Sequence, residues 1–193
     1  IFRYRSLLGV STERIIKERF RGASLGPLWM IIIPLLTLGV YTFVFSVVFQ
    51  VKFGSSAGSK MEFAFLLFAG MIVYNLFAEC INQAPGLILN NSNFVNKVVY
   101  PLEILVVSHL LAAVFQSMVW LSSWFIGYFV FIGLPPSTAI LAPFIVFLSL
   151  PLLLGVMLIL ASLGVFLRDI TQLTGILTMS MLFLSPIFYP ISA

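Results

Sequence analysis

Polar side chains that could take part in chemistry recur at helical spacing inside long apolar stretches of this sequence. In the stretch 63–86, Asn75, Glu79 and Asn82 follow one another at intervals of four and three residues. Such intervals place side chains on one face of a helix. Amides, hydroxyls and a carboxylate on helix faces can bind a hydroxyl-rich ligand or hydrogen-bond one helix to another. The candidate residues of this kind are Asn75, Glu79, Asn82, Gln116, Thr174 and Thr178.

Catalytic chemistry finds little support in the sequence. Cys80 is the single cysteine and His109 the single histidine, so neither a zinc cluster nor a hydrolase triad is favoured. The phosphate-binding pattern G-x-x-x-x-G-K-[ST] is absent from the sequence. We therefore predict that the chain is not an enzyme and holds no cofactor or metal of its own.

Composition identifies the solvent around these polar stripes. The chain has 193 residues, of which 61% are hydrophobic and 8% charged, and its mean hydropathy is +1.16. Soluble domains carry about 25% charged residues. Most of this surface therefore faces lipid, where polar groups are costly and normally face the bundle interior or a water-filled path. The stripes either line a translocation path or hydrogen-bond the helices together, and both interpretations stay open. For Glu79 we favour a role in function or assembly, because a carboxylate there needs a partner. For His109 we favour a role in packing.

Long apolar stretches predict an all-α, polytopic transmembrane bundle in one domain, residues 1–193. A crossing helix needs roughly 20 apolar residues. Polar or proline-containing breaks at 54–60 (GSSAGSK), 133–139 (GLPPSTA) and 168–169 separate the stretches. A sixth span is expected beyond the end of the chain. The five predicted spans are 25–49, 63–86, 102–132, 138–167 and 170–191.

The basic residues predict the orientation. Eight lysines and arginines fall at 1–21, 97 and 168, which lie on one side of five crossings, whereas Lys52 and Lys60 lie on the other. Cytoplasmic loops carry the excess of positive charge. We therefore expect the N-terminus in the cytoplasm.

Residues 1–23 are interpreted as an amphipathic helix that lies in the membrane interface. Glu13 and Lys17 are four residues apart, as are Arg14 and Glu18, so each pair can form an ion pair on the helix surface. Ser11 is a candidate N-cap. The alternative is an ordinary basic tail beside the first span. The basic residues assigned to the interface, where anionic headgroups would attract them, are Arg14, Lys17, Arg19 and Arg21.

A polar loop, residues 90–100, interrupts the apolar pattern on the predicted cytoplasmic side. Phe94, Val95, Val98 and Val99 fall within one arc of a short helix, opposite Asn96 and Lys97. Pro101 suits the first position of the next helix, and Glu103 suits its first turn. An amphipathic helix in a loop predicts contact with a partner.

Four stretches together resemble a known family. They are RFRGASLGPLWMIIIPLL (19–36), NNSNFVNKVVYPLEIL (90–105), GVFLRDI (164–170) and LSPIFYP (184–190). These stretches resemble the permease subunits of ABC-2 type exporters, specifically the polysaccharide and polyol phosphate branch that moves O-antigen, capsule or teichoic acid chains. Family members often have Phe before the loop proline, where this chain has Tyr100.

The resemblance implies a homodimer in the bacterial inner membrane, paired with two copies of a separate ATPase that holds ATP and Mg²⁺. It also implies a lipid-linked polysaccharide as cargo, entering from the cytoplasmic leaflet, where the basic helix could attract its diphosphate. No nucleic acid is expected. In such permeases a helix of the first cytoplasmic loop docks on the ATPase; the matching candidates here are Asn93, Phe94, Asn96, Lys97 and Val98, and Arg168 and Asp169 are candidates for coupling or for closing the cytoplasmic side.

Two other functions stay open. The first is an ABC-2 permease for drugs or small lipids, which would use the same machinery with different cargo. The second is a channel or secondary transporter that works without an ATPase, although such proteins often have paired intramembrane charges. The surface glycans of a deletion strain would distinguish the first alternative from polysaccharide export. Copurification with an ATPase would distinguish an ABC permease from the second alternative.

Overall fold

The computed structural model describes residues 5–44, 60–91 and 101–187, and within these ranges every regular element is a helix. Apolar helices satisfy their own backbone hydrogen bonds, which makes them suitable for lipid. The prediction of an all-α bundle is confirmed. The elements in chain order are α1 (Arg5–Arg19), η2 (Gly26–Leu28), α2 (Trp29–Phe43), α3 (Lys60–Gln83), η4 (Ala84–Gly86), α4 (Leu87–Asn90), α6 (Leu102–Phe131), η5 (Ser137–Ile140), α7 (Leu141–Phe166) and α8 (Ile170–Leu184).

Four helical stretches among the described residues are long and apolar enough to cross a membrane. They are Gly26–Phe43, Met61–Asn90, Leu102–Phe131 and Ser137–Phe166. They correspond to the first four predicted spans, although residues 45–49 of the first lie outside the described ranges. At 1.5 Å per residue the 30-residue stretches reach about 45 Å, which exceeds the roughly 30 Å of hydrocarbon.

The fifth predicted span, 170–191, is described only as far as residue 187. The apolar helix α8 has 15 residues, Ile170–Leu184, and therefore reaches only about 22 Å. Ser185 is extended, with ψ at 139°, because the residue before a proline, here Pro186, is disfavoured in the α region. Residues 188–191 lie outside the described part of the chain.

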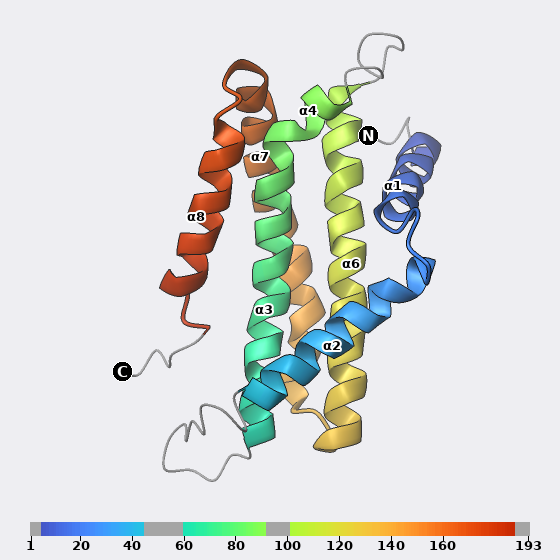
Figure 1. The fold of residues 1–193 in the computed structure, drawn as a ribbon, viewed down its shortest axis with the longest axis vertical. Helices are drawn as coiled ribbons and strands as arrows, with labels where there is room; N and C mark the ends of the chain where they lie inside the picture. The colour runs from blue at the N-terminus through green and yellow to red at the C-terminus, as the bar shows by residue number, and fades with distance from the viewer. Residues whose placement is uncertain (1–4, 45–59, 92–100, 188–193) are drawn as a thin grey trace.

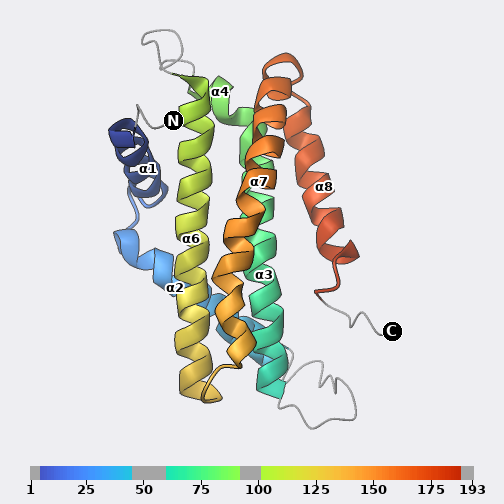
Figure 2. The same ribbon diagram turned by 180° about the vertical axis from the view of Figure 1, so that it is seen from behind.

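Figures 1 and 2 show α3, α6 and α7 running side by side through the molecule, with α8 next to α3 and α2 crossing α3 and α6 obliquely. The N-terminal helix α1 lies against α6 near one end of the bundle. The short helix α4 and the α7–α8 turn lie at that same end. One end of the bundle therefore carries α1, the start of the 90–100 loop and the Arg168–Asp169 turn, as the predicted topology requires.

Two apolar clusters form the core. One joins α2, α3 and α6 around Leu38, Phe65, Phe68 and Trp124, where the Trp124 indole Nε1 donates a 2.8 Å hydrogen bond to the Phe65 carbonyl oxygen. The other joins α3, η4, α4, α6 and α7, and it extends from Leu87 in α4 to Val146 near the start of α7. Apolar packing thus holds α2, α3, α6 and α7 together, whereas no described residue of α1 or α8 belongs to either cluster.

Gly164 of α7 lies directly against the backbone of Pro85 in η4. A Cβ atom built on Gly164 would lie 2.2 Å from the Pro85 carbonyl oxygen. Real Cβ atoms do not approach so closely, so only glycine fits here. Small residues let membrane helices approach backbone to backbone in this way. This contact positions the end of α3 against α7.

Candidate polar site between the N-terminal helix and the bundle

An ion pair joins α1 to the second span. The Arg19 guanidinium donates a hydrogen bond to the Glu79 carboxylate of α3. Both side chains are mostly buried, with 22% and 21% of their surface exposed. The predicted need of Glu79 for a partner is thus met by a residue 60 positions earlier. Arg19, which the sequence placed with the interfacial cations, turns into the bundle instead.

Two further side chains extend this pair into a hydrogen-bonded chain. The Gln83 amide Nε2 donates to Glu79 Oε1 at 3.3 Å, and Gln83 Oε1 lies 3.3 Å from His109 Nδ1 on α6. Because a carbonyl oxygen only accepts, this contact requires a proton on His109 Nδ1. The chain Arg19–Glu79–Gln83–His109 therefore ties three helices together, and His109 has the partner that a packing role predicts.

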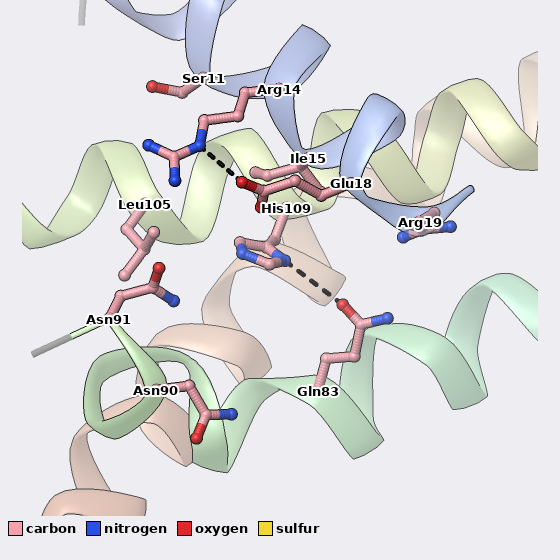
Figure 3. A pocket seen from close by; sticks show the side chains of 10 residues that line it. All are labelled: Ser11, Arg14, Ile15, Glu18, Arg19, Gln83, Asn90, Asn91, Leu105 and His109. Carbon is pink, nitrogen blue, oxygen red and sulfur yellow. Dashed lines mark hydrogen bonds and ion pairs between the residues drawn. The ribbon is translucent and has the colours of Figure 1, made fainter. Parts of the chain in front are cut away.

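A pocket of about 340 Å³ opens beside this chain, between α1, the end of α3, α4 and α6 (Figure 3). The side chains that converge on it come from all of these elements, and the Arg14–Glu18 pair borders it on α1. Its volume lies within the 300–1,000 Å³ typical of small-molecule sites. The lining residues are Ser11, Arg14, Ile15, Glu18, Arg19, Gln83, Asn90, Asn91, Leu105 and His109.

A second pocket, of about 230 Å³, lies between α2, α3 and α6 and shares Arg19 with the first. Most of its lining is apolar, including Ile33, Ile72 and Trp120. The path candidates Asn75, Glu79 and Gln116 also line it. The Ser117 hydroxyl, also in the lining, is 5% exposed and has no hydrogen-bond partner among the described residues. The structure thus brings three of the six path candidates together.

The other three path candidates lie on a different side of α3. The Thr178 hydroxyl lies 3.2 Å from Asn82 Oδ1 and 3.0 Å from the Thr174 carbonyl oxygen. The Tyr74 hydroxyl donates to the Thr178 carbonyl oxygen at 2.9 Å. Thr174 and Thr178 are only 4% and 3% exposed. Tyr74, Asn82 and Thr178 thus attach α8 to α3.

The charges of α1 are largely paired. The predicted ion pairs are confirmed, with Lys17 Nζ 2.6 Å from Glu13 Oε1 and Arg14 Nε 2.8 Å from Glu18 Oε1. The Lys17 ammonium holds the pKa of Glu13 below its usual range, first through the hydrogen bond and then through its charge. Ser11 lies within α1, which already includes Arg5, so it is not an N-cap. Arg21 follows the helix and is exposed.

Arg168 and Asp169 form the turn between α7 and α8, and both are exposed. Within the described part of the chain, no ion pair joins them. The Asp169 carbonyl oxygen accepts from the backbone amides of Gln172 and Leu173, at 3.0 and 3.2 Å. This opens α8. The role of the pair in coupling stays a prediction.

The proposed ATPase contact lies outside the described residues. Asn93, Phe94, Asn96, Lys97 and Val98 all fall in the range 92–100. The described chain reaches Asn91, whose amide Nδ2 donates to the Leu87 carbonyl oxygen at 2.9 Å, and resumes at Pro101. Both ends of the range lie at the end of the bundle that carries α1 (Figure 1).

Sequence reasoning missed part of the first pocket. Gln83 lies four residues after Glu79, so its place beside that carboxylate follows from helical spacing. Asn90 and Asn91 join the pocket because η4 bends the chain after Gln83; the Pro85-Gly86 pair was the available signal. Within residues 5–44, 60–91 and 101–187, no three His, Cys, Asp or Glu side chains gather where they could hold a metal ion.

The described part of the structure has four helices long enough to cross a membrane, and a polar junction joins them to the basic N-terminal helix. These features define a multi-pass membrane protein. Comparison with known proteins narrows the class. The chain belongs to the ABC-2 type transporter family, whose family model matches residues 6–193. It is therefore the membrane subunit of a transporter, a permease, as the four motifs predicted.

Relatives with similarity along the whole chain carry a more specific name. The O-antigen export system permease protein RfbA of Myxococcus xanthus is 26% identical over 192 residues, which cover 100% of this chain and 71% of the relative. Two proteins of the same name from Klebsiella pneumoniae are each 25% identical over 185 residues, covering 95% of this chain and 68% of theirs.

Proposed function

We propose that this permease exports a lipid-linked polysaccharide of the O-antigen type across the bacterial inner membrane. The observation that carries the proposal is the similarity to relatives named as O-antigen export permeases, which extends over 95–100% of this chain. The side-chain amides of Gln83, Asn90 and Asn91 in the first pocket suit a hydroxyl-rich cargo. Capsule and teichoic acid chains share this chemistry and are the nearest alternatives within the proposal.

The energy for export comes from a separate ATPase, which holds ATP and Mg²⁺, with the permease acting as a homodimer. Motion enters through residues 92–99, and the adjacent Arg168–Asp169 turn helps to close the same side. The N-terminus faces the cytoplasm. In support of this arrangement, α1, the ends of the 92–100 loop and the α7–α8 turn lie at one end of the bundle (Figure 2), which is the end that carries most of the basic residues.

The experiment for the cargo is the surface glycan profile of a strain that lacks this gene, with and without a plasmid that restores it. We expect surface polysaccharide to be lost and lipid-linked chains to accumulate inside the cell. Restoration by the plasmid is the control. Unchanged surface glycans would refute polysaccharide export and favour a permease for drugs or small lipids.

The experiment for the ATPase is copurification. Replacing Asn96 and Lys97 together by alanine should reduce the amount of ATPase recovered with the permease, while membrane insertion stays normal. Lys52→Ala with Lys60→Ala, at the opposite end of the predicted topology, is the matched control. Equal recovery from both double variants would refute the contact, and no ATPase with the unmodified protein would favour an ATPase-independent transporter.

A further inference from the structure

A short connector, residues 84–91, joins α3 to the range 92–100. It consists of η4, α4 and the capping residue Asn91. The Leu87 backbone amide donates to the Ala84 carbonyl oxygen, and the Asn91 amide Nδ2 donates to the Leu87 carbonyl oxygen at 2.9 Å. Because these hydrogen bonds link its two short helices in series, the connector can move as one piece.

The connector is fixed to α7 through a contact between backbones. A Cβ atom built on Gly164 would lie 2.2 Å from the Pro85 carbonyl oxygen and 2.7 Å from the carbonyl carbon. Ala84 and Leu87 of the connector and Ala161 of α7 are at most 3% exposed and belong to one apolar cluster. A contact between backbones has no rotamer that can adjust, and close-packed interiors transmit strain. Movement of the connector therefore displaces the end of α7.

The covalent routes out of the connector contain breaks. Pro85 interrupts the helical ladder between α3 and α4, because proline has no amide hydrogen to donate, and the chain forms the 3₁₀ segment η4 there. Such segments within a helix often mark hinges. On the other side of the range 92–100, Pro101 is extended, with ψ at 119°, before α6 begins. The contact with α7 is thus the more rigid route for movement.

The end of α7 leads directly to the turn before α8. Gly164 lies in the last turn of α7, which ends at Phe166, and α8 begins at Ile170. The connector and the α7–α8 turn lie at the same end of the bundle (Figure 2). A displacement of Gly164 therefore reaches the Arg168–Asp169 turn and α8 through the end of a single helix.

We propose that Gly164 is a positioning residue for the coupling of ATP hydrolysis to transport. Its contact with Pro85 makes α7 the helix that takes up movement of the ATPase-contacting loop and passes it to α8. The helices that flank that loop in the sequence, α3 and α6, follow with less constraint because of the breaks at Pro85 and Pro101. The inference rests on the proposed function, in which residues 92–99 contact the ATPase.

The first test compares Gly164→Ala with Gly155→Ala in the copurified complex of permease and ATPase, reconstituted in liposomes. The methyl group added at position 164 pushes the connector away from α7. We expect ATP hydrolysis to persist, while the amount of lipid-linked glycan moved per ATP hydrolysed falls several-fold. The glycan is extracted from the native membrane.

The ratio of export to hydrolysis separates coupling from stability, because unfolded protein does neither. Gly155 has open space around it, so Gly155→Ala should keep the ratio of the unmodified complex. An unchanged ratio in Gly164→Ala would overturn the proposal.

A second measurement leaves Gly164 unchanged and needs no cargo. Spin labels are attached to cysteines that replace exposed residues, namely Leu89 of the connector, Leu163 of α7 and Phe115 of α6. The buried Cys80 is replaced by alanine, and one of the two protomers is labelled. Pulsed electron spin resonance then measures the distances between the labels with and without ATP.

We expect ATP to change the distance from Leu163 to Phe115, because α7 moves against α6. The distance from Leu89 to Leu163 should stay constant, because the connector and the end of α7 move together. A change in the second distance, or no change in the first, would overturn the proposal even if Gly164→Ala fails to fold.

The two tests distinguish failure of this inference from failure of the proposed function. An unmodified complex that moves no glycan would refute polysaccharide export, while the spin-label distances would still decide the route of movement. An unmodified permease that recovers no ATPase would refute both.

Discussion

Two polar regions flank α3, one where Glu79 meets Arg19 of α1 and one where Asn82 meets Thr178 of α8. The first contains charges and borders two pockets, whereas the second contains neutral groups, of which Thr174 and Thr178 are buried and Asn82 is exposed. Both begin from residues only three positions apart on the same helix. Polar residues along one membrane span can therefore contact two neighbouring helices, bordering pockets on one side of the span and packing against a helix on the other.

The difference also changes the interpretation of Thr178. Its hydroxyl has one proton, yet Asn82 Oδ1 and the carbonyl oxygens of Thr174 and Gly175 all lie within 3.2 Å. The proton can satisfy one acceptor at a time, and two of the three belong to its own helix. The Asn82 contact therefore holds α8 to α3 only weakly, whereas the Arg19–Glu79 pair joins α1 to α3 through two side chains of opposite charge.

Gly164→Ala should have the largest effect, because the added methyl group would clash with the backbone of η4, which directly follows α3. The new Cβ would meet the Pro85 carbonyl oxygen at 2.2 Å, and overpacking costs about 1–3 kcal/mol. We expect the melting temperature in detergent to fall by about 3–10 °C. Gly155→Ala on the same helix has open space around it and should change little. Equal melting temperatures for the two variants would contradict the close contact.

Arg19→Gln should destabilise the region around Glu79 without affecting the contact between Asn82 and Thr178. It leaves the Glu79 carboxylate mostly buried and without its cation, at a cost of about 1–3 kcal/mol. Glu79→Gln added to Arg19→Gln should cost less than the sum of the single changes, and a double-mutant cycle of melting temperatures measures this coupling. Strict additivity would mean that the two side chains do not interact.

Thr178→Val should have a smaller effect, confined to the attachment of α8. Hydrogen bonds between membrane helices average about 0.6 kcal/mol, and valine keeps nearly the same shape. Ser180→Ala is the control, because its hydroxyl bonds only the Ile176 carbonyl oxygen of its own helix among the described residues. Hydrogen exchange of α8 is the measurement, with faster exchange expected for Thr178→Val alone. A similar increase in both variants would argue against the bond to Asn82.

Lys17→Met should have the smallest effect. The Lys17 ammonium lowers the pKa of Glu13, so the pair stabilises the folded helix above the ordinary pKa of glutamate and loses this contribution as the pH falls through the lowered value. The variant should return the pKa of Glu13 toward 4.5 with little change in melting temperature, since exposed pairs contribute little. Carboxyl NMR of labelled protein measures this shift, and no shift would exclude the pair in solution.

Local patterns account for much of the fold. Hydropathy predicted four spans within a few residues, because lipid imposes the length of an apolar helix. The prolines after Leu184 predicted a break near the end of the fifth span, and α8 ends there, with Ser185 extended. The ion pairs within α1 followed from a spacing of four residues. Each of these inferences depends on neighbours in the sequence, which is why it needed no tertiary information.

The sequence by itself determined that this is a membrane protein with costly polar groups in its spans, and that Glu79 requires a partner. Only the tertiary structure decided that the partner is Arg19 and that Gln83 reaches His109 on another helix. Helical periodicity shows which residues share a face but not which helix covers it. That choice depends on how α1, α6 and α8 pack around α3, and so on contacts between residues far apart in the chain.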